Sequence, residues 1–146
     1  MISEKILVAV DNSEQNKSAF RWICKTAKRT KSMLVATYVN VVPYSEPLNA
    51  EIPEINTGES VLSVIEAIAS EEKVKIQTLI LQGRAIGPTL VAGSNSIGAD
   101  TIMLIPENPG STDSAFDKTS KYVMTHSKCN TLIWSSNKRL DGKISS

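Results

Sequence analysis

The sequence predicts a single α/β domain built on a parallel sheet. Short apolar segments with strand character alternate with segments of helical periodicity along the chain. The strand segments are apolar on both faces, as in sheets that helices cover on both sides. The length of 146 residues matches one domain. Right-handed crossovers through the helices would then make successive strands parallel.

Five short, largely apolar segments predict the strands. They are Lys5–Val10, Met33–Val42, Lys75–Gln82, Asp100–Ile105 and Cys129–Ser135. We assign residues 1–137 to the domain and residues 138–146 to a C-terminal tail.

The segments between the strands predict four helices, because apolar residues recur there at helical spacing. These helices span residues 11–30, Glu59–Glu72, a segment that Pro88 opens and that runs to residue 99, and Thr119–Ser127. The proline-marked stretch from Pro43 to Gly58 predicts a loop, as do residues 106–116. At the first helix, Asp11, Asn12 and Ser13 are all good N-cap residues, and Asp11 with Glu14 forms a variant of the capping box.

Composition and charge exclude several classes of protein. The chain has 16 basic and 15 acidic residues, with a net charge of +1 and no basic stripe, which argues against a nucleic-acid partner. No apolar stretch reaches the about 20 residues that cross a bilayer, and the first residues lack a signal-peptide pattern, so we expect a cytoplasmic protein without a membrane partner. Cys24 and Cys129 lack metal-site or redox spacing, which predicts reduced thiols.

Asp11 directly follows the first predicted strand, which is the place where parallel sheets usually bind ligands. Ligands lie beyond the carboxyl ends of the strands, where the strand order reverses, and the first strand is usually central. A helix cap explains Asp11 as well as a ligand contact does, and its position alone does not separate the two roles.

Several segments resemble the universal stress protein family. ILVAVDNSEQNKSAF, residues 6–20, resembles the opening strand and turn of that family, where V-D-x-S precedes the first helix. Val35–Val41 resembles its second strand, and GADTIMLI, residues 98–105, resembles its A-D-L-I-V-V segment. KTSKYVMTHSKCNTLIW, residues 118–134, is similar to the closing helix and strand of the family without gaps.

The resemblance implies a three-layer α/β/α, Rossmann-like fold of the adenine nucleotide alpha hydrolase-like type. It implies a five-stranded parallel sheet in the order 3-2-1-4-5 and a homodimer, often made through the last strand. In this chain Leu132 and Trp134 lie in that strand, and an exposed apolar edge strand favours pairing. Trp22 and Trp134 both lie in apolar patterns, which predicts packing in the core or at a dimer interface.

The resemblance also implies a candidate nucleotide site. Some family members bind ATP through positions that correspond here to Asp11, to Val39 and to the loop between Leu104 and Ser120. That loop has a G-x2-G-x9-G-[S/T] pattern in the family, and its glycines let backbone N–H groups approach the phosphates. This sequence departs from every diagnostic glycine: Ile105 and Asn108 replace the first two, and Asp117-Lys118 replaces the final pair. The remaining candidate contacts in this segment are Gly110 and Ser111, in a displaced turn with Thr112, and Ser120.

We therefore expect a non-catalytic, homodimeric regulatory or adaptor domain in stress response, without ATP binding of the family's usual kind and without a required cofactor. The alternative is an ATP- or AMP-binding member that uses Asp11 and a rearranged loop over residues 106–120, with slow ATP hydrolysis. A small-ligand enzyme is disfavoured because no base–nucleophile pair is evident. His126 is the only histidine and lies late in the last helix, so neither a catalytic relay nor a metal site is predicted.

Overall fold

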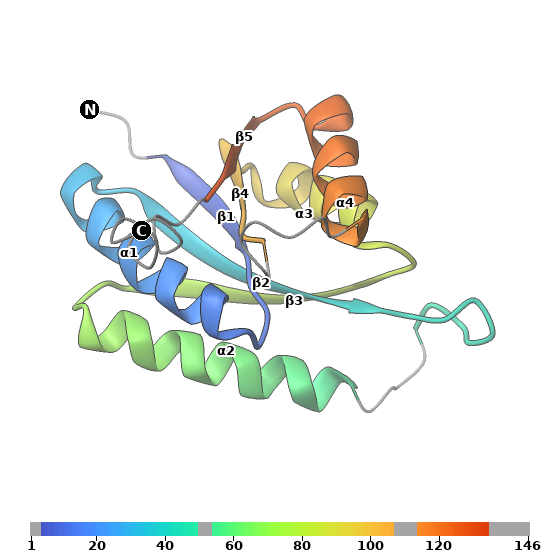
Figure 1. Cartoon of the computed structure of the whole chain (residues 1–146), viewed down its shortest axis with the longest axis horizontal. Helices are drawn as coiled ribbons and strands as arrows, with labels where there is room; N and C mark the ends of the chain where they lie inside the picture. The colour runs from blue at the N-terminus through green and yellow to red at the C-terminus, as the bar shows by residue number, and fades with distance from the viewer. Residues whose placement is uncertain (1–3, 50–53, 107–113, 135–146) are drawn as a thin grey trace, which may run out of the picture.

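A computed structural model describes residues 4–49, 54–106 and 114–134 of the chain. It contains a five-stranded sheet with the order β3-β2-β1-β4-β5, in which all neighbouring strands are parallel (Figure 1). The strands are β1 (Lys5–Ala9), β2 (Met33–Val41), β3 (Ile76–Gly83), β4 (Thr101–Leu104) and β5 (Asn130–Ile133). The predicted parallel sheet and its strand order are confirmed.

Four helices cover the two faces of this sheet. They are α1 (Glu14–Thr30), α2 (Glu54–Glu71), α3 (Ile86–Ile97) and α4 (Ser114–His126). Helices α1 and α2 lie on one face, and α3 and α4 lie on the other (Figure 1). This arrangement is the predicted three-layer α/β/α architecture. None of the helices in the described part of the chain is long and apolar enough to span a lipid bilayer.

Three helices begin earlier than the sequence predicts. Helix α2 begins at Glu54, so the prediction of a loop as far as Gly58 is wrong. Gly58 is tolerated inside the helix because it packs directly on the ring of Tyr38. A Cβ at this position would lie 2.8 Å from Cδ2 of Tyr38, which is too close for a larger residue. Helix α3 begins at Ile86, with Pro88 inside its first turn, where backbone N–H groups have no intrahelical partner. Helix α4 begins at Ser114, so the predicted loop over residues 106–116 is wrong for its last residues.

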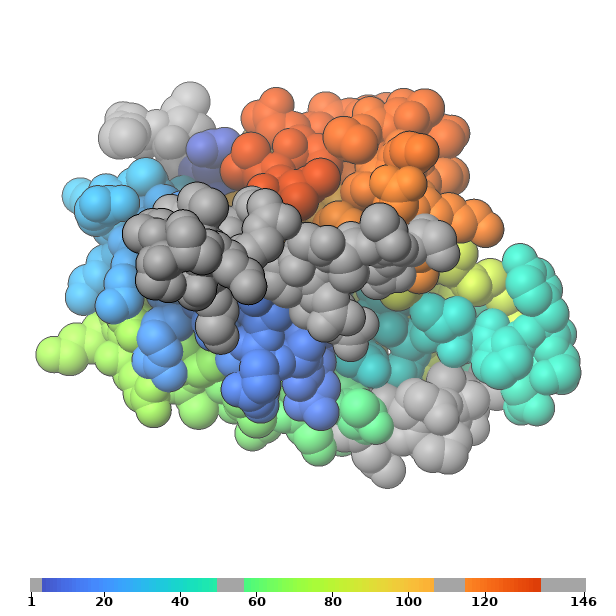
Figure 2. Space-filling model, viewed as in Figure 1, coloured from blue at the N-terminus to red at the C-terminus, as the bar shows by residue number. Residues whose placement is uncertain are grey.

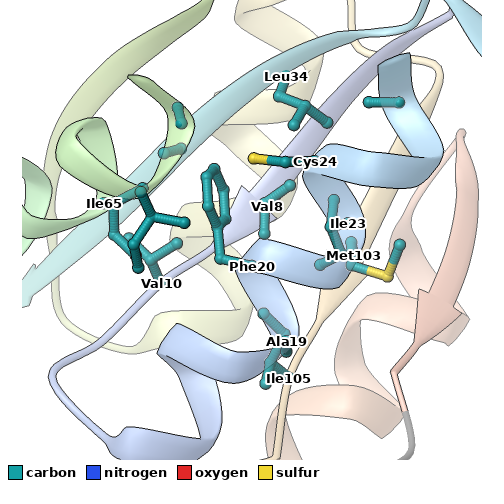
Figure 3. Close-up of a cluster of buried hydrophobic side chains, with 14 of the residues drawn as sticks. Val8, Val10, Ala19, Phe20, Ile23, Cys24, Leu34, Ile65, Met103 and Ile105 are labelled. Atoms are coloured by element: carbon teal, nitrogen blue, oxygen red, sulfur yellow. The ribbon is translucent and has the colours of Figure 1, made fainter. Parts of the chain in front are cut away.

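The hydrophobic core forms two clusters, one on each face of the sheet. The cluster beneath α1 and α2 surrounds Phe20, which is fully buried between the two helices and the strands (Figure 3). The cluster beneath α3 and α4 consists of Leu7, Leu90, Ile102, Leu104 and Val123. Because side chains of a strand alternate between faces, neighbours such as Leu7 and Val8 enter different clusters.

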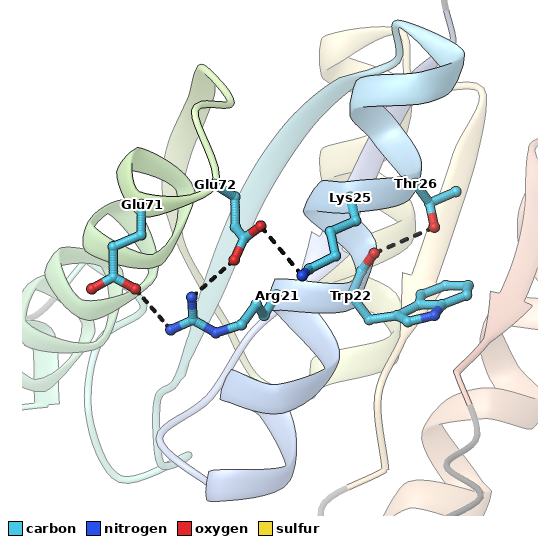
Figure 4. A network of polar contacts seen from close by, with 6 residues as sticks. All are labelled: Arg21, Trp22, Lys25, Thr26, Glu71 and Glu72. Atoms are coloured by element: carbon cyan, nitrogen blue, oxygen red, sulfur yellow. Dashed lines mark hydrogen bonds and ion pairs between the residues drawn. The ribbon is translucent and has the colours of Figure 1, made fainter.

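Ion pairs join α1 and α2 above the first cluster. Arg21 contacts Glu71 and Glu72, each at 2.9 Å, and Lys25 lies 3.8 Å from Glu72 (Figure 4). Cys24, on the buried side of α1, has no exposed surface, and this burial raises the pKa of its thiol to about 11.

Two further expectations from the sequence concern cysteines and tryptophans. Cys24 and Cys129 are both free thiols, as predicted. Trp134 packs against the α1–α2 cluster, as expected for core packing. Trp22 is 52% exposed, so the prediction that it packs in the core is wrong for this chain. Its side chain lies on the side of α1 away from the ion pairs (Figure 4).

The strands end at different levels, which positions the candidate site. The pairing of β1 with β2 ends at Ala9 and Thr37, whereas β2 and β3 remain paired as far as Val41 and Gly83. The β2–β3 ribbon therefore extends beyond the end of β1 (Figure 1). Among the residues that the structure describes, this stagger leaves one edge of β2 without a neighbouring strand next to the end of β1.

Candidate functional site

A cavity lies at the carboxyl ends of the strands, where the strand order reverses. The chain proceeds outward from β1 to β2 and β3 and then returns to β4 on the other side of β1. Connections diverge at such a point and leave a crevice. The cavity has a volume of about 270 Å³. It is lined by Ala9, Val10, Asp11, Thr37, Tyr38, Val39, Ile86, Leu90, Leu104, Ile105, Ala115, Phe116 and Thr119.

Asp11 lines this cavity and also shapes the turn into α1. Its Oδ1 atom accepts a hydrogen bond of 2.7 Å from the backbone N–H of Ser13. Ser13 is the N-cap, because its Oγ atom accepts a bond of 3.1 Å from the N–H of Asn16. The predicted capping box between Asp11 and Glu14 is therefore wrong: Asp11 supports the turn that precedes the cap. The other carboxylate oxygen, Oδ2, makes no hydrogen bond with the described residues.

Val39 lies on the β2 wall of the same cavity. In a parallel sheet, alternate residues of a strand direct their backbone groups to the same neighbour. The carbonyl of Thr37 accepts a bond of 2.9 Å from the N–H of Val10, so Thr37 faces the β1 side. The backbone groups of Val39 face that side as well, beyond the end of β1. The structure thus brings the Asp11 carboxylate and an open peptide edge at Val39 to one cavity.

Helix α4 forms the opposite wall through Ala115, Phe116 and Thr119. These residues share one face of the helix, since they are spaced three and four positions apart. Ser120, the hydroxyl expected in the site, does not line the cavity. Its side chain is buried elsewhere, and its Oγ atom donates a bond of 3.1 Å to the carbonyl of Asp117. The sequence pattern missed Thr119, the neighbouring residue, which lines the cavity.

Only part of the segment that was expected to contact the phosphates, residues 105–120, lies within the described residues. Gly110 and Ser111 lie outside the described residues, as does Asn108. Asp117 lies in the first turn of α4, where it forms an ion pair with Lys121 at 3.3 Å. A carboxylate at this position already compensates the positive end of the helix dipole, which lowers the attraction of that end for a phosphate.

Arg84 fixes the segment that follows β2, beside the cavity. Its Nη1 atom donates to the carbonyl of Glu46 at 2.8 Å and also to that of Pro43, and its guanidinium lies 5.2 Å from the ring centre of Tyr44. In the space-filling view, the segment after β2 lies beside the start of α3 (Figure 2). Sequence reasoning missed this role, because the contacts of Arg84 join positions about forty residues apart.

His126 lies outside the cavity lining, in the last turn of α4. Its Nδ1 atom is 3.1 Å from the carbonyl of Tyr122, and the two rings stack with their centres 4.0 Å apart. This exposed position at the helix C-terminus agrees with the expected location of the residue. No group of three or more histidine, cysteine or acidic side chains in the described ranges is arranged to hold a metal ion.

Solved structures with a similar fold support the arrangement of these elements. A universal stress protein from Archaeoglobus fulgidus in complex with dAMP has a TM-score of 0.69 at 16% identity, and the match covers 91% of this chain and 98% of that one. A universal stress protein in complex with cAMP has a TM-score of 0.68 at 18% identity, with 91% and 97% coverage. An Arabidopsis thaliana family protein with AMP bound has a TM-score of 0.68 at 16% identity, with 93% and 94% coverage.

Comparison of the sequence with curated proteins gives no match. The sequence model of the universal stress protein family, in contrast, matches residues 3–134. This match includes all five strands and all four helices. The chain therefore belongs to the universal stress protein family.

Proposed function

We propose that this protein is a non-catalytic regulatory member of its family that binds the nucleoside part of an adenine nucleotide in the crevice beside Asp11. The observation that carries the proposal is the cavity where the Asp11 carboxylate and the open backbone edge of Val39 meet. Three relatives with a similar fold were solved with dAMP, cAMP and AMP, which are all monophosphates.

The cavity has the chemistry that a nucleoside needs. Most of its lining side chains are aliphatic or aromatic and suit the faces of a base. The backbone edge at Val39 offers a donor and an acceptor to the edge of that base. The free Oδ2 atom of Asp11 can accept a hydrogen bond from a ribose hydroxyl, which is the role of an acidic residue in many dinucleotide sites.

A long phosphate chain has less support in this protein. Each added phosphate brings negative charge toward the start of α4, where Asp117 already lies. The carboxylate of Asp117 repels the phosphates. The Nζ atom of Lys121 lies 3.3 Å from this carboxylate, so its positive charge is already paired with Asp117. We therefore propose that adenosine and AMP bind at least as tightly as ATP.

The proposal of a non-catalytic role follows from the chemistry of the same crevice. Asp11 contributes the only carboxylate among the described lining residues, and one of its oxygens already binds Ser13. Hydrolysis by a positioned base would need a second group that activates water or a nucleophile. His126, the single histidine of the chain, lies on the last turn of α4 and not in this lining.

We also propose that two copies associate through β5, the edge strand next to β4. Leu132 is 49% exposed and Ile133 is 44% exposed on this strand. An edge with open backbone groups and apolar side chains favours pairing with a second copy. Trp134 contributes less to such an interface, because it packs against the core of its own chain.

Calorimetric titration with adenosine, AMP and ATP tests the nucleotide proposal. We expect adenosine and AMP to bind the protein, and Asp11→Asn to raise their Kd about tenfold because a neutral amide accepts a weaker hydrogen bond. Asp100→Asn is the matched control: Asp100 also accepts a backbone bond, at 2.8 Å from Lys5, but at the opposite end of the sheet. No heat with any ligand at millimolar concentration would contradict the proposal, as would ADP formed from ATP in proportion to the protein.

A further inference from the structure

Strand β3 forms one edge of the sheet, and among the described residues no strand pairs with its outer side. It pairs only with β2, along all eight residues from Ile76 to Gly83. None of these residues is charged and none is a proline, although natural proteins commonly protect edge strands with such residues. The other edge strand, β5, has four residues. Strand β3 is therefore the longer edge that another chain could reach.

The open backbone groups of this edge belong to alternate residues of β3. The carbonyl of Gly83 accepts a bond of 2.8 Å from the N–H of Val42, so the backbone groups of Gly83 face β2. Since alternate residues of a parallel strand face the same neighbour, Thr78 and Ile80 direct their N–H and C=O groups outward. In the described part of the chain, no backbone group bonds to them. They offer a row of donors and acceptors to an extended peptide.

A groove lies between this edge and α2, which runs along β3 (Figure 1). It has a volume of about 450 Å³ and is lined by Glu59, Leu62, Glu66, Thr78, Leu79 and Ile80. The three residues from α2 are spaced three and four positions apart, so they form one stripe of the helix. Glu59 and Glu66 are exposed, and neither forms an ion pair with a described residue. The groove therefore has two unpaired negative charges on either side of an apolar residue.

We propose that the β3 edge binds an extended segment of a partner protein that carries two basic side chains on one face, with an apolar side chain between them. Such a segment would add a strand to the sheet. Its side chains would return to the α2 face at every second residue, which places the two basic residues about 13 Å apart. Glu59 and Glu66 are separated by about 10.5 Å along the helix axis. The flexible side chains of lysine or arginine can bridge this difference.

Charge argues against a second copy of this chain at the same edge. Pairing of two β3 edges about a twofold axis would bring identical surfaces together. Glu59 and Glu66 of both copies would then meet at one interface, where like charges repel each other. A basic segment neutralises these charges instead, which favours specific and fast association. The groove shares no residue with the crevice beside Asp11, so this proposal does not depend on nucleotide binding.

Nuclear magnetic resonance of the isotope-labelled protein tests the proposal, with the end-blocked peptide TTKTVTKTT as the probe. We expect the amide resonances of Thr78 and Ile80 to shift on titration, because their N–H groups would donate to the peptide. The peptide TTETVTETT is the matched control, since it keeps the strand-forming pattern and reverses the charges. It should bind about tenfold more weakly or not at all. Added salt should weaken the binding of TTKTVTKTT.

Three variants separate the contributions of charge and backbone. Glu66→Gln should raise the Kd for TTKTVTKTT about two- to fivefold, which is the effect of one exposed ion pair. Glu14→Gln is the matched control, because Glu14 is exposed on α1 and does not line the groove, and its Kd should be unchanged. Thr78→Pro removes an outward N–H that the pairing with β2 does not use, and it should abolish binding. If circular dichroism shows that Thr78→Pro is unfolded, the two peptides and Glu66→Gln decide the question.

Several results would overturn the proposal. They are the absence of binding at millimolar peptide, equal binding of the two peptides, and shifts confined to residues outside β3 and α2. Shifts of Thr78 and Ile80 that depend on protein concentration without peptide would assign the edge to a second copy and would also overturn it. Binding of TTKTVTKTT by a protein that binds no nucleotide would support this proposal while the proposed function fails.

Discussion

The carboxylate of Asp11 is joined to the backbone N–H of Ser13 by a hydrogen bond of 2.7 Å, and Ser13 caps α1. The residue that faces the crevice therefore also fixes the turn into the first helix. The two roles use different oxygens, since Oδ1 binds Ser13 and Oδ2 makes no bond with the described residues. The sequence left open whether Asp11 caps the helix or contacts a ligand. Asp11 instead supports the turn before the cap, Ser13, and this role is compatible with a ligand contact.

This division of roles predicts different effects of two substitutions at Asp11. Asp11→Ala removes the acceptor for the N–H of Ser13 and should lower the free energy of unfolding by about 1 kcal/mol, the usual value of such a bond. Asp11→Asn keeps an oxygen acceptor and should cost less than about 0.5 kcal/mol. Urea unfolding followed by circular dichroism measures both values. Equal stability of the two variants would show that the turn does not depend on this bond.

Gly83 provides a second test of the structure at the end of β3. A Cβ at Gly83 would lie 3.0 Å from the Cβ of Thr89 and would also collide with its Oγ1 atom. Gly83→Ala should therefore lower the free energy of unfolding by about 1–3 kcal/mol, as overpacking does. Because Thr89→Ala removes Oγ1 and Cγ2 of this side chain and leaves only its Cβ, the same change should cost less in that background. Equal costs of Gly83→Ala in both backgrounds would contradict the packing described.

The sheet was predictable from the sequence because its strands are short apolar runs separated by helical periodicity. The start of α2 at Glu54 was not, because the prolines and Gly58 of this stretch predict a loop as far as Gly58. Its place in the helix depends on the ring of Tyr38, a contact between residues far apart in the sequence. Local patterns do not contain such tertiary contacts, which override intrinsic propensity.

The crevice was predictable in part for a similar reason. Asp11 could be placed because it directly follows a central strand, and Val39 because the second strand has a clear counterpart in the family. Thr119 was missed in favour of Ser120. Neighbouring residues on a helix point about 100° apart, and the packing of α4 places Thr119 in the lining of the cavity and buries Ser120. That orientation requires the packing of the whole helix.

The raised pKa of Cys24 predicts how the stability of the protein depends on pH. Burial raises this pKa from 9.0 to about 11, so the folded protein holds the thiol proton more tightly than the unfolded chain does. This contribution to stability is complete below pH 9 and is lost as the pH rises toward 11. The difference in unfolding free energy between the unchanged protein and Cys24→Ala should therefore shrink over this range. A difference that stays constant with pH would contradict the prediction.

The exposed side chains of β5 predict how self-association can be disrupted. A charge on an edge strand opposes pairing with another strand, because the charge would have to be buried at the interface. Leu132→Lys should therefore convert a dimer into a monomer in sedimentation experiments at micromolar concentration. Since Leu132 is 49% exposed in the single chain, the variant should remain folded by circular dichroism.

Met124→Lys is a suitable control for this experiment. Met124 is 55% exposed and lies on α4 and not on β5, so the variant adds the same charge to another apolar surface position. We expect it to sediment as the unchanged protein does. A monomeric unchanged protein would contradict association through β5, and so would a Leu132→Lys variant that remains dimeric, because a lysine in the centre of a four-residue strand could not be accommodated between two paired copies without a large loss of affinity.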